Sequence, residues 1–202
     1  MILRVARSVA AVSAVLSVSP VLTASIWHVD DSVSSSGDGK SPATAFKRIQ
    51  QGIHAASGGD KVIVAEGNYF ERIHFPGKNI ILSSTNPLSD EVVFDTIIDG
   101  DLAGTVVTFD GTETGDCVVE GFTIRDGKAE HGGGIRGGMA ELHTQATIRE
   151  NVITGNVTGG SGGGLPLPGG VPLTVVRFTV CGSVGVVHFI RGVSAQRACP
   201  NC

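Results

Sequence analysis

The stretch from Asp60 to Ser84, DKVIVAEGNYFERIHFPGKNIILSS, constrains the fold more than any other part of the chain. It contains three short β-rich runs, Val62–Ala65, Arg72–Phe75 and Asn79–Ser84, with only turn residues between them. Gly and Asn in these turns tolerate the positive φ that tight corners need. No two-residue Asn-Gly or Asp-Gly hairpin turn joins the runs, so their even spacing predicts a coil of strands and not a pair of hairpins.

Three later runs are also rich in β-forming residues and predict further strands: Thr96–Asp99, Thr105–Phe109 and Cys117–Arg125. The stretch NPLSDEVVFD before the first of them is rich in turn residues, which predicts an irregular excursion.

A repeat becomes visible beyond residue 119. Glu120–Phe122 and Gly132–Ile135 recur as Glu150–Val152 and Gly162–Leu165, each at an offset of 30 residues. Repeats of about 20 to 50 residues indicate a solenoid, whose units bury their apolar faces only by stacking on one another. The chain has 29 glycines and 5% aromatic residues, which favours tight turns and thin packed layers over a large aromatic core.

Residues 42–57 have the pattern of an amphipathic helix. Ser41 can cap it, Pro42 suits its first turn, and Gly58-Gly59 can end it. Its apolar stripe consists of Phe46, Ile49, Ile53 and Ala56. A helix directly before a series of strands can cover the open edge of a solenoid, so we expect an N-terminal capping helix here.

The segment 1–25 has the features of a secretory signal peptide. Arg4 and Arg7 give a positively charged start, an apolar run of small residues follows, and Thr23-Ala24-Ser25 offers a cleavage site. Pro20 and several serines in the apolar run argue against a membrane anchor. We therefore expect export to the cell surface or the medium, with no stable membrane span after cleavage. The mature chain should open with IWHVDDS, a short strand in which Trp27 and Val29 alternate with His28 and Asp30.

The charge balance argues against a nucleic-acid partner. The whole chain carries 15 basic and 19 acidic residues, a net charge of −4. Without a leader that contains Arg4 and Arg7, 13 basic residues remain against 19 acidic ones, a net charge of −6. A mildly acidic chain without a Lys/Arg cluster is a poor nucleic-acid binder.

Corner and stacking residues follow a recognisable pattern from Gly59 onward: Gly59-Asp60, Ile63, Ala65, Gly67, Tyr69, Glu71 and Gly77-Lys78-Asn79-Ile80-Leu82. This pattern resembles the opening of secreted proteins of the pectin-lyase-like superfamily. Downstream, GFTIRDG…GGGI and ENVITGN…GGGL resemble repeats of bacterial surface β-helix and polymorphic outer-membrane proteins. The resemblance covers roughly residues 26–165 and implies an all-β fold, a right-handed parallel β-helix (β-solenoid) with a capping helix.

Two groups of carboxylates are candidate catalytic residues, because polysaccharide cleavage uses paired acids or an acid with a base. They are Asp95, Asp99 and Asp101, and then Asp110, Glu113 and Asp116. The intervening Gly100 makes Asp-Gly turn chemistry the stronger interpretation of the first group. Calcium binding by these acids is poorly supported, because no spaced Asp/Asn/Gly loop of known type is present. The sequence therefore predicts no catalytic, cofactor-binding or metal-ligating residues.

Gly67, Tyr69 and Glu71 resemble the first motif of pectin methylesterases within the same superfamily. Those enzymes also need two aspartates, a Gln and an Arg in later motifs, and the chain has no Gln-Asp-Thr-like or Asp-Phe-Ile-Phe-like segment. The Asp-Asp and Gly-His-Gly signatures of polygalacturonase-type β-helices are missing too, with His131-Gly132 as the nearest echo. Tyr69 and Glu71 are therefore interpreted as fold residues.

The four cysteines do not suggest a metal site. Cys199 and Cys202 have C-x-x-C spacing, but a zinc ribbon needs a second close pair, and Cys117 and Cys181 lie far apart in the sequence. In an exported protein a disulfide is the simpler expectation. The six histidines are scattered without an i, i+4 pair. Asn156-Val157-Thr158 is a glycosylation sequon, although the repeats resemble bacterial proteins.

The segment 166–202 differs in character, because it has no acidic residue. No triple-glycine corner recurs in it at the expected offset. One interpretation is two terminal strands, Val175–Val180 and Val184–Ile190. The other, which we favour from the sequence, is a reading frame broken after Leu165, so that the solenoid is cut short.

Two functions are compatible with these features. The first, which we favour, is an exported non-catalytic β-helix module that contacts polysaccharide or other cell-surface components. The second is a fragment of a polysaccharide lyase, hydrolase or pectin esterase-like enzyme whose catalytic coils are missing. Fold analogy cannot decide between them, because β-helices host both roles.

Overall fold

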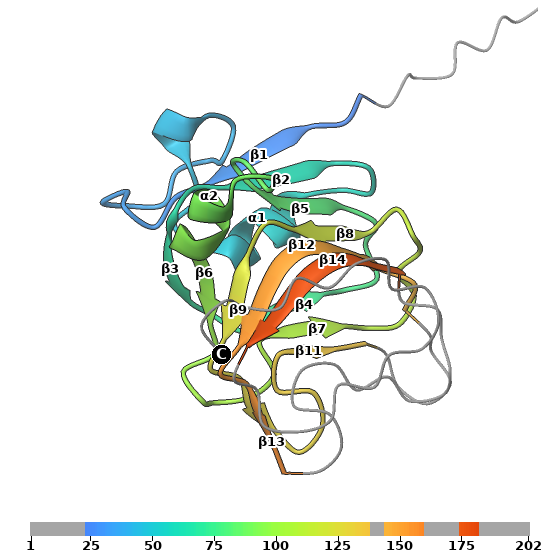
Figure 1. Cartoon of the computed structure of the whole chain (residues 1–202). Coiled ribbons are helices and arrows are strands. Elements are labelled where there is room, and N and C mark those ends of the chain that lie inside the picture. The colour runs from blue at the N-terminus through green and yellow to red at the C-terminus, as the bar shows by residue number, and fades with distance from the viewer. Residues whose placement is uncertain (1–22, 138–143, 160–173, 182–202) are drawn as a thin grey trace, which may run out of the picture.

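The computed structural model describes residues 23–137, 144–159 and 174–181, which form mostly β strands in parallel sheets with few helices (Figure 1). Residues 1–22, most of the expected signal peptide, lie outside this range. So do the triple glycine at 162–164, two of the four cysteines and the expected strand at 184–190.

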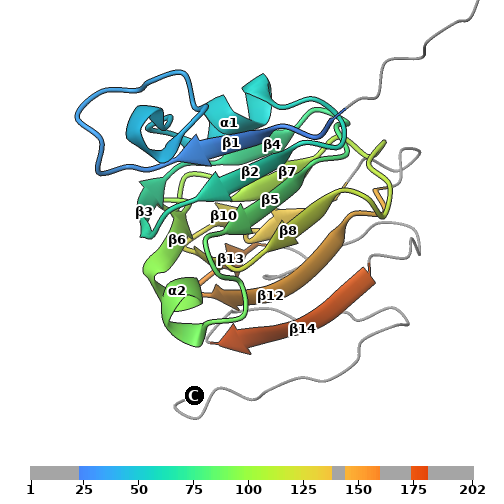
Figure 2. The same ribbon diagram turned by 90° about the horizontal axis from the view of Figure 1, so that it is seen from above.

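A nine-stranded sheet dominates the molecule, and every strand pair described in it is parallel. Figure 2 shows its strands at Ile26–Val29, Lys61–Val64, Ile81–Ser84 and Val118–Glu120 side by side. The order along the sheet is β1 (Ile26–Val29), β2 (Lys61–Val64), β5 (Ile81–Ser84), β8 (Val118–Glu120), β12 (Thr147–Thr154), β9 (Thr123–Arg125), β6 (Thr96–Asp99) and β3 (Gly67–Phe70), with β14 (Thr174–Cys181) on the free side of β12.

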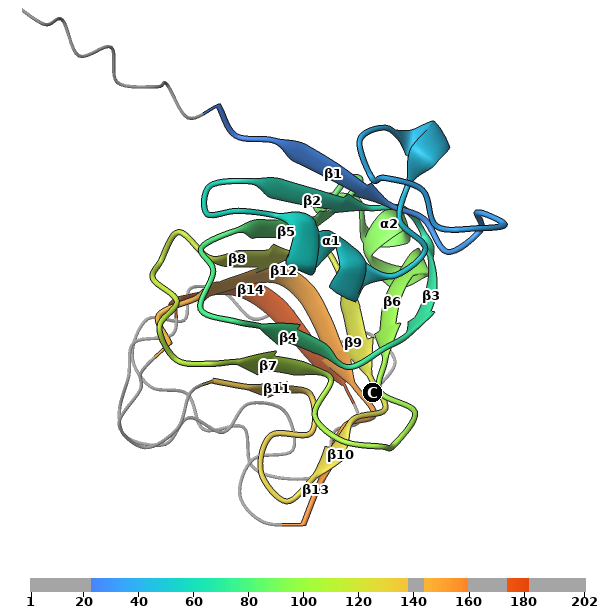
Figure 3. The same cartoon turned by 180° about the vertical axis from the view of Figure 1, so that it is seen from behind.

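Two smaller parallel sheets complete the β structure of the described residues. The three-stranded sheet consists of β4 (Ile73–Phe75), β7 (Val107–Phe109) and β11 (Ile135–Arg136), and the two-stranded one of β10 (Lys128–Ala129) and β13 (Val157–Thr158). Figure 3 shows β4, β7 and β11 one above the other. From β2 onward, consecutive strands along the chain thus fall into different sheets or sheet regions, and each pairs with strands from a later or earlier passage of the chain.

The core lies between the sheets and is built from stacks of apolar side chains in register. Val62, Leu82, Val119 and Ile148 form one stack, and Tyr69, Ile98, Ile124 and Ile153 form another. Ile73, Val107 and Ile135 form a third, beside the stacked rings of Phe75 and Phe109, whose centroids are 4.8 Å apart. All these side chains are at most 2% exposed. Each passage of the chain therefore buries its apolar residues against the next passage.

The structural repeat is one residue shorter than the sequence letters indicate. Thr147 pairs with Val118, Val152 with Thr123 and Val157 with Lys128, so the predicted offset is wrong. The backbone conformations agree with the shorter offset. Gly121 (φ +83°) corresponds to Glu150 (φ +52°), and Asp126 (φ +53°) corresponds to Gly155 (φ +63°). Identical residues at the predicted offset do not mark equivalent positions, because a left-handed corner here accepts either glycine or an acidic residue.

Two buried asparagines, Asn151 and Asn156, join the last of these passages to the one before it. The Asn151 amide accepts a hydrogen bond from the Phe122 N–H and donates to the carbonyls of Val119 and Arg149. Asn151 is 1% exposed and directly follows a left-handed residue. It therefore satisfies backbone groups where the strand direction changes.

Asn156 repeats this arrangement at the next corner. It accepts a hydrogen bond from the Gly127 N–H and donates to the carbonyls of Ile124 and Thr154. Its side chain is fully buried. The glycosylation sequon at this position is therefore not accessible in the folded chain.

The expected helix over residues 42–57 is broken in two. Pro42–Thr44 form a short 3-10 helix capped by Ser41, and α1 covers only Ile49–Ala55. Between them, Phe46 pairs with strand β1, donating its N–H to the His28 carbonyl and accepting from the Asp30 N–H at 2.8 Å each. Extended pairing of Phe46 overrides the helical pattern of its segment.

Helix α1 covers the free edge of β4, as Figure 3 shows. The Gln50 amide donates to the His74 carbonyl at 3.1 Å and accepts from the His74 N–H at 2.8 Å. Ile49 and Ile53 of α1 are fully buried in the core. The side chain of Gln50 thus takes the place of a neighbouring strand at this edge.

Charged side chains hold both ends of α1. At its start, the Glu71 carboxylate accepts from the N–H groups of Ile49 (2.8 Å) and Gln50 (3.1 Å). At its end, the Lys78 ammonium donates to the carbonyls of Ile53 (3.2 Å), His54 (2.9 Å) and Ala56 (2.8 Å). An acid at the N-terminus and a base at the C-terminus both complement the helix dipole.

A second carboxylate ties the N-terminal segment to the turn after α1. Asp60 accepts hydrogen bonds from the Ser25 N–H (2.7 Å), the Trp27 indole (3.0 Å) and the Ser57 N–H (2.9 Å). Burial alone would raise the pKa of Asp60, but these hydrogen bonds and the positive charge of Lys78 lower it below its ordinary value. Asp60 therefore stays ionised under ordinary conditions.

Two further segments differ from the sequence expectations. Gly67–Phe70, part of which the sequence predicts as a turn, forms strand β3, because its register places Tyr69 in an apolar stack. The expected irregular excursion contains helix α2 (Asp90–Asp95), which Ser89 caps through the Val92 N–H.

The tail residues Thr174–Cys181 form β14 in parallel register on β12, where the first interpretation of the tail expects a strand.

Candidate functional site

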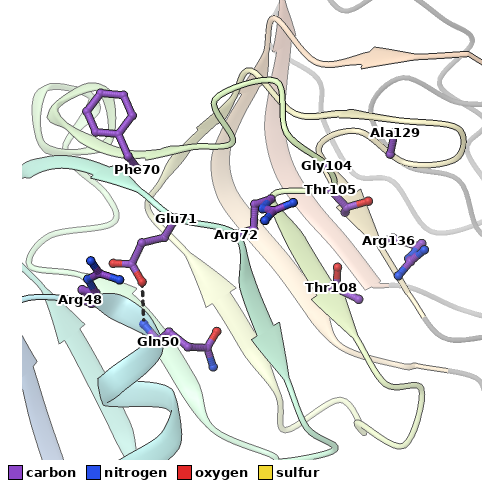
Figure 4. Close-up of a pocket in the computed structure, with 10 residues that line it drawn as sticks. All are labelled: Arg48, Gln50, Phe70, Glu71, Arg72, Gly104, Thr105, Thr108, Ala129 and Arg136. Atoms are coloured by element: carbon purple, nitrogen blue, oxygen red, sulfur yellow. Dashed lines mark hydrogen bonds between the residues drawn. The ribbon is translucent and has the colours of Figure 1, made fainter.

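An open groove of about 700 Å³ crosses the outer surface of the three-stranded sheet (Figure 4). Its lining comes from the start of α1, the β3–β4 corner, the loop before β7, and strands β7, β10 and β11. The residues are Arg48, Gln50, Phe70, Glu71, Arg72, Gly104, Thr105, Thr108, Ala129 and Arg136.

Three arginines give the groove its charge. Arg48, Arg72 and Arg136 are all exposed, and Glu71 is the one carboxylate among the lining residues. The Arg72 guanidinium donates one hydrogen bond to the Ala103 carbonyl at 2.5 Å, which orients it and leaves its other N–H groups available. Guanidinium groups bind oxyanions such as carboxylate and sulfate through paired hydrogen bonds.

The arginines are spread across the strands and not along one strand. Arg72 directly precedes β4, and Arg136 ends β11, two strands further on through β7. With an interstrand spacing of about 4.8 Å and a rise of about 3.3 Å per residue, the two backbone positions are roughly 10–12 Å apart. Arg48 lies beyond the other edge of β4, at the start of α1. An extended ligand that contacts all three must run across the strands.

Phe70 provides an apolar surface at one end of the groove. Phe70 is the last residue of β3 and is 67% exposed, whereas Tyr69, the residue before it, is buried. Tyr69 donates its hydroxyl to the Ala65 carbonyl at 2.9 Å, and burial raises its pKa. A large exposed aromatic ring beside polar groups is a feature of binding surfaces, where the ring packs on an apolar face of a ligand.

Glu71 links the groove to helix α1. Both of its carboxylate oxygens accept N–H groups of the helix start, and it is half-buried. Burial raises the pKa of Glu71, against the opposing effects of the Gln50 and Ile49 N–H groups and of the nearby charge on Arg48. With both oxygens engaged, Glu71 is poorly placed to act as a nucleophile or a base.

His74 and Asp110 form a hydrogen-bonded pair next to the groove. His74 Nε2 lies 2.5 Å from an Asp110 carboxylate oxygen, and both side chains are about half exposed. His74, Thr108 and Arg136 are register neighbours on the outward side of β4, β7 and β11. The sequence alone shows His74 only as one of six scattered histidines.

The carboxylates singled out from the sequence are held by structural contacts. Asp99 is 5% exposed, pairs with the Arg125 guanidinium at 2.9 Å and accepts the Asp101 N–H, which is the expected turn chemistry. Glu113 is 1% exposed and accepts the N–H groups of Gly77, Asp110 and Gly111.

The remaining acids of the two groups are also separate from the groove. Asp95 ends α2, Asp110 pairs with His74, and Asp116 shares a hydrogen bond with the Thr114 hydroxyl. None of the six lines the groove. The structure thus does not assemble them into a shared site within the residues it describes.

Gly67 and Glu71, which resemble a methylesterase motif, have structural roles here. A Cβ at Gly67 would lie 2.3 Å from the Asp31 carboxylate, which accepts the Asn68 N–H. Glu71 holds the start of α1.

Cys117 is a free thiol in the core, and burial raises its pKa to about 12. Among the described residues, no three His, Cys, Asp or Glu side chains are grouped as a metal site would need.

The sequence did not reveal the groove, because its residues come from separate segments without a motif. One available signal was Phe70-Glu71-Arg72, an aromatic residue followed by two charged ones, directly before β4. Their combined meaning depends on the stacking of later strands, which brings Thr108 and Arg136 beside them.

No family model matches the chain, and no curated protein or solved structure matches it either. In the part of the chain that the structure describes, no helix is long and apolar enough to cross a membrane.

Proposed function

We propose that the chain is a right-handed parallel β-helix of the pectin-lyase-like kind, exported to the cell surface, that binds polysaccharide without cleaving it. Three features support the fold assignment: parallel pairing of all the described strands, an apolar core of side chains stacked in register, and a structural repeat that relates β8 and β9 to β12. The leader-like residues 1–25 support export.

The observation that carries the binding function is the composition of the groove. It combines an exposed aromatic ring, three exposed arginines and two threonines over the three-stranded sheet. Such a surface suits a sugar chain with anionic groups, because the ring packs on sugar C–H groups while guanidinium groups pair with the anions. Its single carboxylate is engaged by helix N–H groups, so the paired acids that glycoside hydrolysis uses are lacking among the lining residues.

Retention on immobilised polygalacturonate tests this function, with Phe70→Ala as the informative variant. We expect the native chain to be retained and Phe70→Ala to bind about tenfold more weakly, because the variant loses the packing surface. Phe94→Ala is the matched control, since Phe94 is 52% exposed on α2 and does not line the groove.

The same incubations are assayed for reducing ends and for unsaturated products. Retention without product supports a binding module. Accumulation of either product, in proportion to protein concentration, would favour a polysaccharide-cleaving enzyme instead. Equal retention of Phe70→Ala and the native chain would mean that the polysaccharide binds outside the groove.

A further inference from the structure

We propose that Glu71 makes the affinity of the groove for anionic polysaccharide depend on pH, by adding a negative charge among the arginines when ionised and removing it when protonated. The inference rests on the proposed polysaccharide-binding function and assigns its regulation to one residue. Glu71 lies between Arg48 and Arg72 in the groove lining, and its half-buried side chain points toward the start of α1 (Figure 4).

The charge balance of the groove makes this one carboxylate important. Its charged lining residues are three arginines and Glu71, so the net charge is +2 with Glu71 ionised and +3 with Glu71 protonated. Arginine keeps its charge over the whole accessible pH range. A ligand anion is therefore attracted more strongly once Glu71 is neutral, and binding in turn favours proton uptake by Glu71.

The structural setting moves the protonation of Glu71 to a higher pH than that of an exposed glutamate. Burial of Glu71 raises its pKa above the ordinary value of 4.5, so protonation begins at a higher pH than for an exposed glutamate. The neutral carboxyl still has one carbonyl oxygen that can accept a helix N–H, so Glu71 keeps part of its contact with the start of helix α1.

His74 is a further ionisable side chain beside the groove. It belongs to β4, on which α1 packs, and its ring is paired with Asp110 outside the groove lining. The other charged residues that line the groove with Glu71 are Arg48 before α1, whose charge acts on Glu71, Arg72 on its own segment and Arg136 on β11. A His74→Asn variant therefore separates the two contributions.

The test measures binding of dextran sulfate by calorimetry between pH 7.5 and pH 4.5, with uncharged dextran as control. Dextran sulfate keeps its charge over this interval, so changes in affinity report on the protein. We expect the affinity of the native chain to rise about fivefold as pH falls, the factor that one unit charge about 4 Å away supplies in water. Glu71→Gln should bind at pH 7.5 about as tightly as the native chain does at low pH, with a flat profile, and His74→Asn should keep most of the native rise.

A second measurement on the native chain does not depend on how the variants fold. Titrations in buffers of different ionisation enthalpy should show uptake of a fraction of one proton on binding near the midpoint of the rise. A flat affinity profile, no proton uptake, or loss of the rise in His74→Asn with its retention in Glu71→Gln would overturn the assignment to Glu71. Absence of binding to any polysaccharide at every pH would instead overturn the proposed function, and equal binding of double-stranded DNA would point to a different class of ligand.

Discussion

Replacing either buried asparagine by alanine is expected to destabilise the fold by about 3–5 kcal/mol. Asn151→Ala leaves the Phe122 N–H and the Val119 and Arg149 carbonyls without their partner, and each unpaired buried group costs about 1–3 kcal/mol. Asn156→Ala should have a similar effect through the Gly127 N–H and two carbonyls. The free energy of unfolding is obtained from urea denaturation.

Asn86→Ala is the matched control for these variants. Asn86 is exposed in the turn before α2, and its side chain accepts one long hydrogen bond of 3.4 Å from the Leu88 N–H. We expect a loss of about 0.5 kcal/mol or less for it. A comparably small loss for Asn151→Ala would show that this residue does not join neighbouring passages of the chain.

The charged groups at the two ends of α1 give the second large effect. Lys78→Met removes three hydrogen bonds from an ammonium group to the last carbonyls of the helix, and we expect a loss of about 2–3 kcal/mol. Glu71→Gln keeps one acceptor oxygen but turns an amide N–H₂ toward a helix N–H, so about 1–2 kcal/mol should be lost.

The double variant distinguishes a shared role from two separate ones. If both side chains hold the same helix on the sheet, the second substitution should cost at least about 1 kcal/mol less than it does alone, because the helix is already loosened. Lys40→Met, an exposed loop lysine, is the control and should change stability little. Strict additivity of Lys78→Met and Glu71→Gln would mean that α1 does not respond as a unit.

Sequence patterns are sufficient for the elements whose local preference agrees with their final environment. Thr96–Asp99 is predicted with its observed bounds, and the runs at Val62 and Ile81 shift by one or two residues. These strands place β-branched or aliphatic residues on the buried side, so alternation alone indicates them.

The errors occur where contacts between distant residues decide the structure. The helical pattern includes Phe46, which pairs with β1, and the turn pattern includes part of Gly67–Phe70, which stacks on β6. The predicted repeat offset is one residue too long because Glu150, and not a glycine, adopts the left-handed corner conformation. Such outcomes depend on the register between strands from different passages of the chain, which local propensity does not encode.

The groove illustrates the same limit for function. The missing partners of the methylesterase motif indicate that Glu71 is a fold residue, and its contacts to α1 agree with that. Its place beside Arg48 and Arg72 could not be foreseen, because Arg48 comes from the segment before α1 that the helix prediction covers. The polysaccharide-binding function stays a prediction that the groove supports.

Hydrogen–deuterium exchange with and without polygalacturonate tests most directly whether a polysaccharide lies across the strands in this groove. We expect added protection at residues 70–72, 104–108 and 128–136, which line the groove or border it, and unchanged exchange at residues 88–94 around α2. Protection at all three groove segments together would match a chain that runs across β4, β7 and β11. Protection confined to residues 88–94, or to one groove segment alone, would contradict the account.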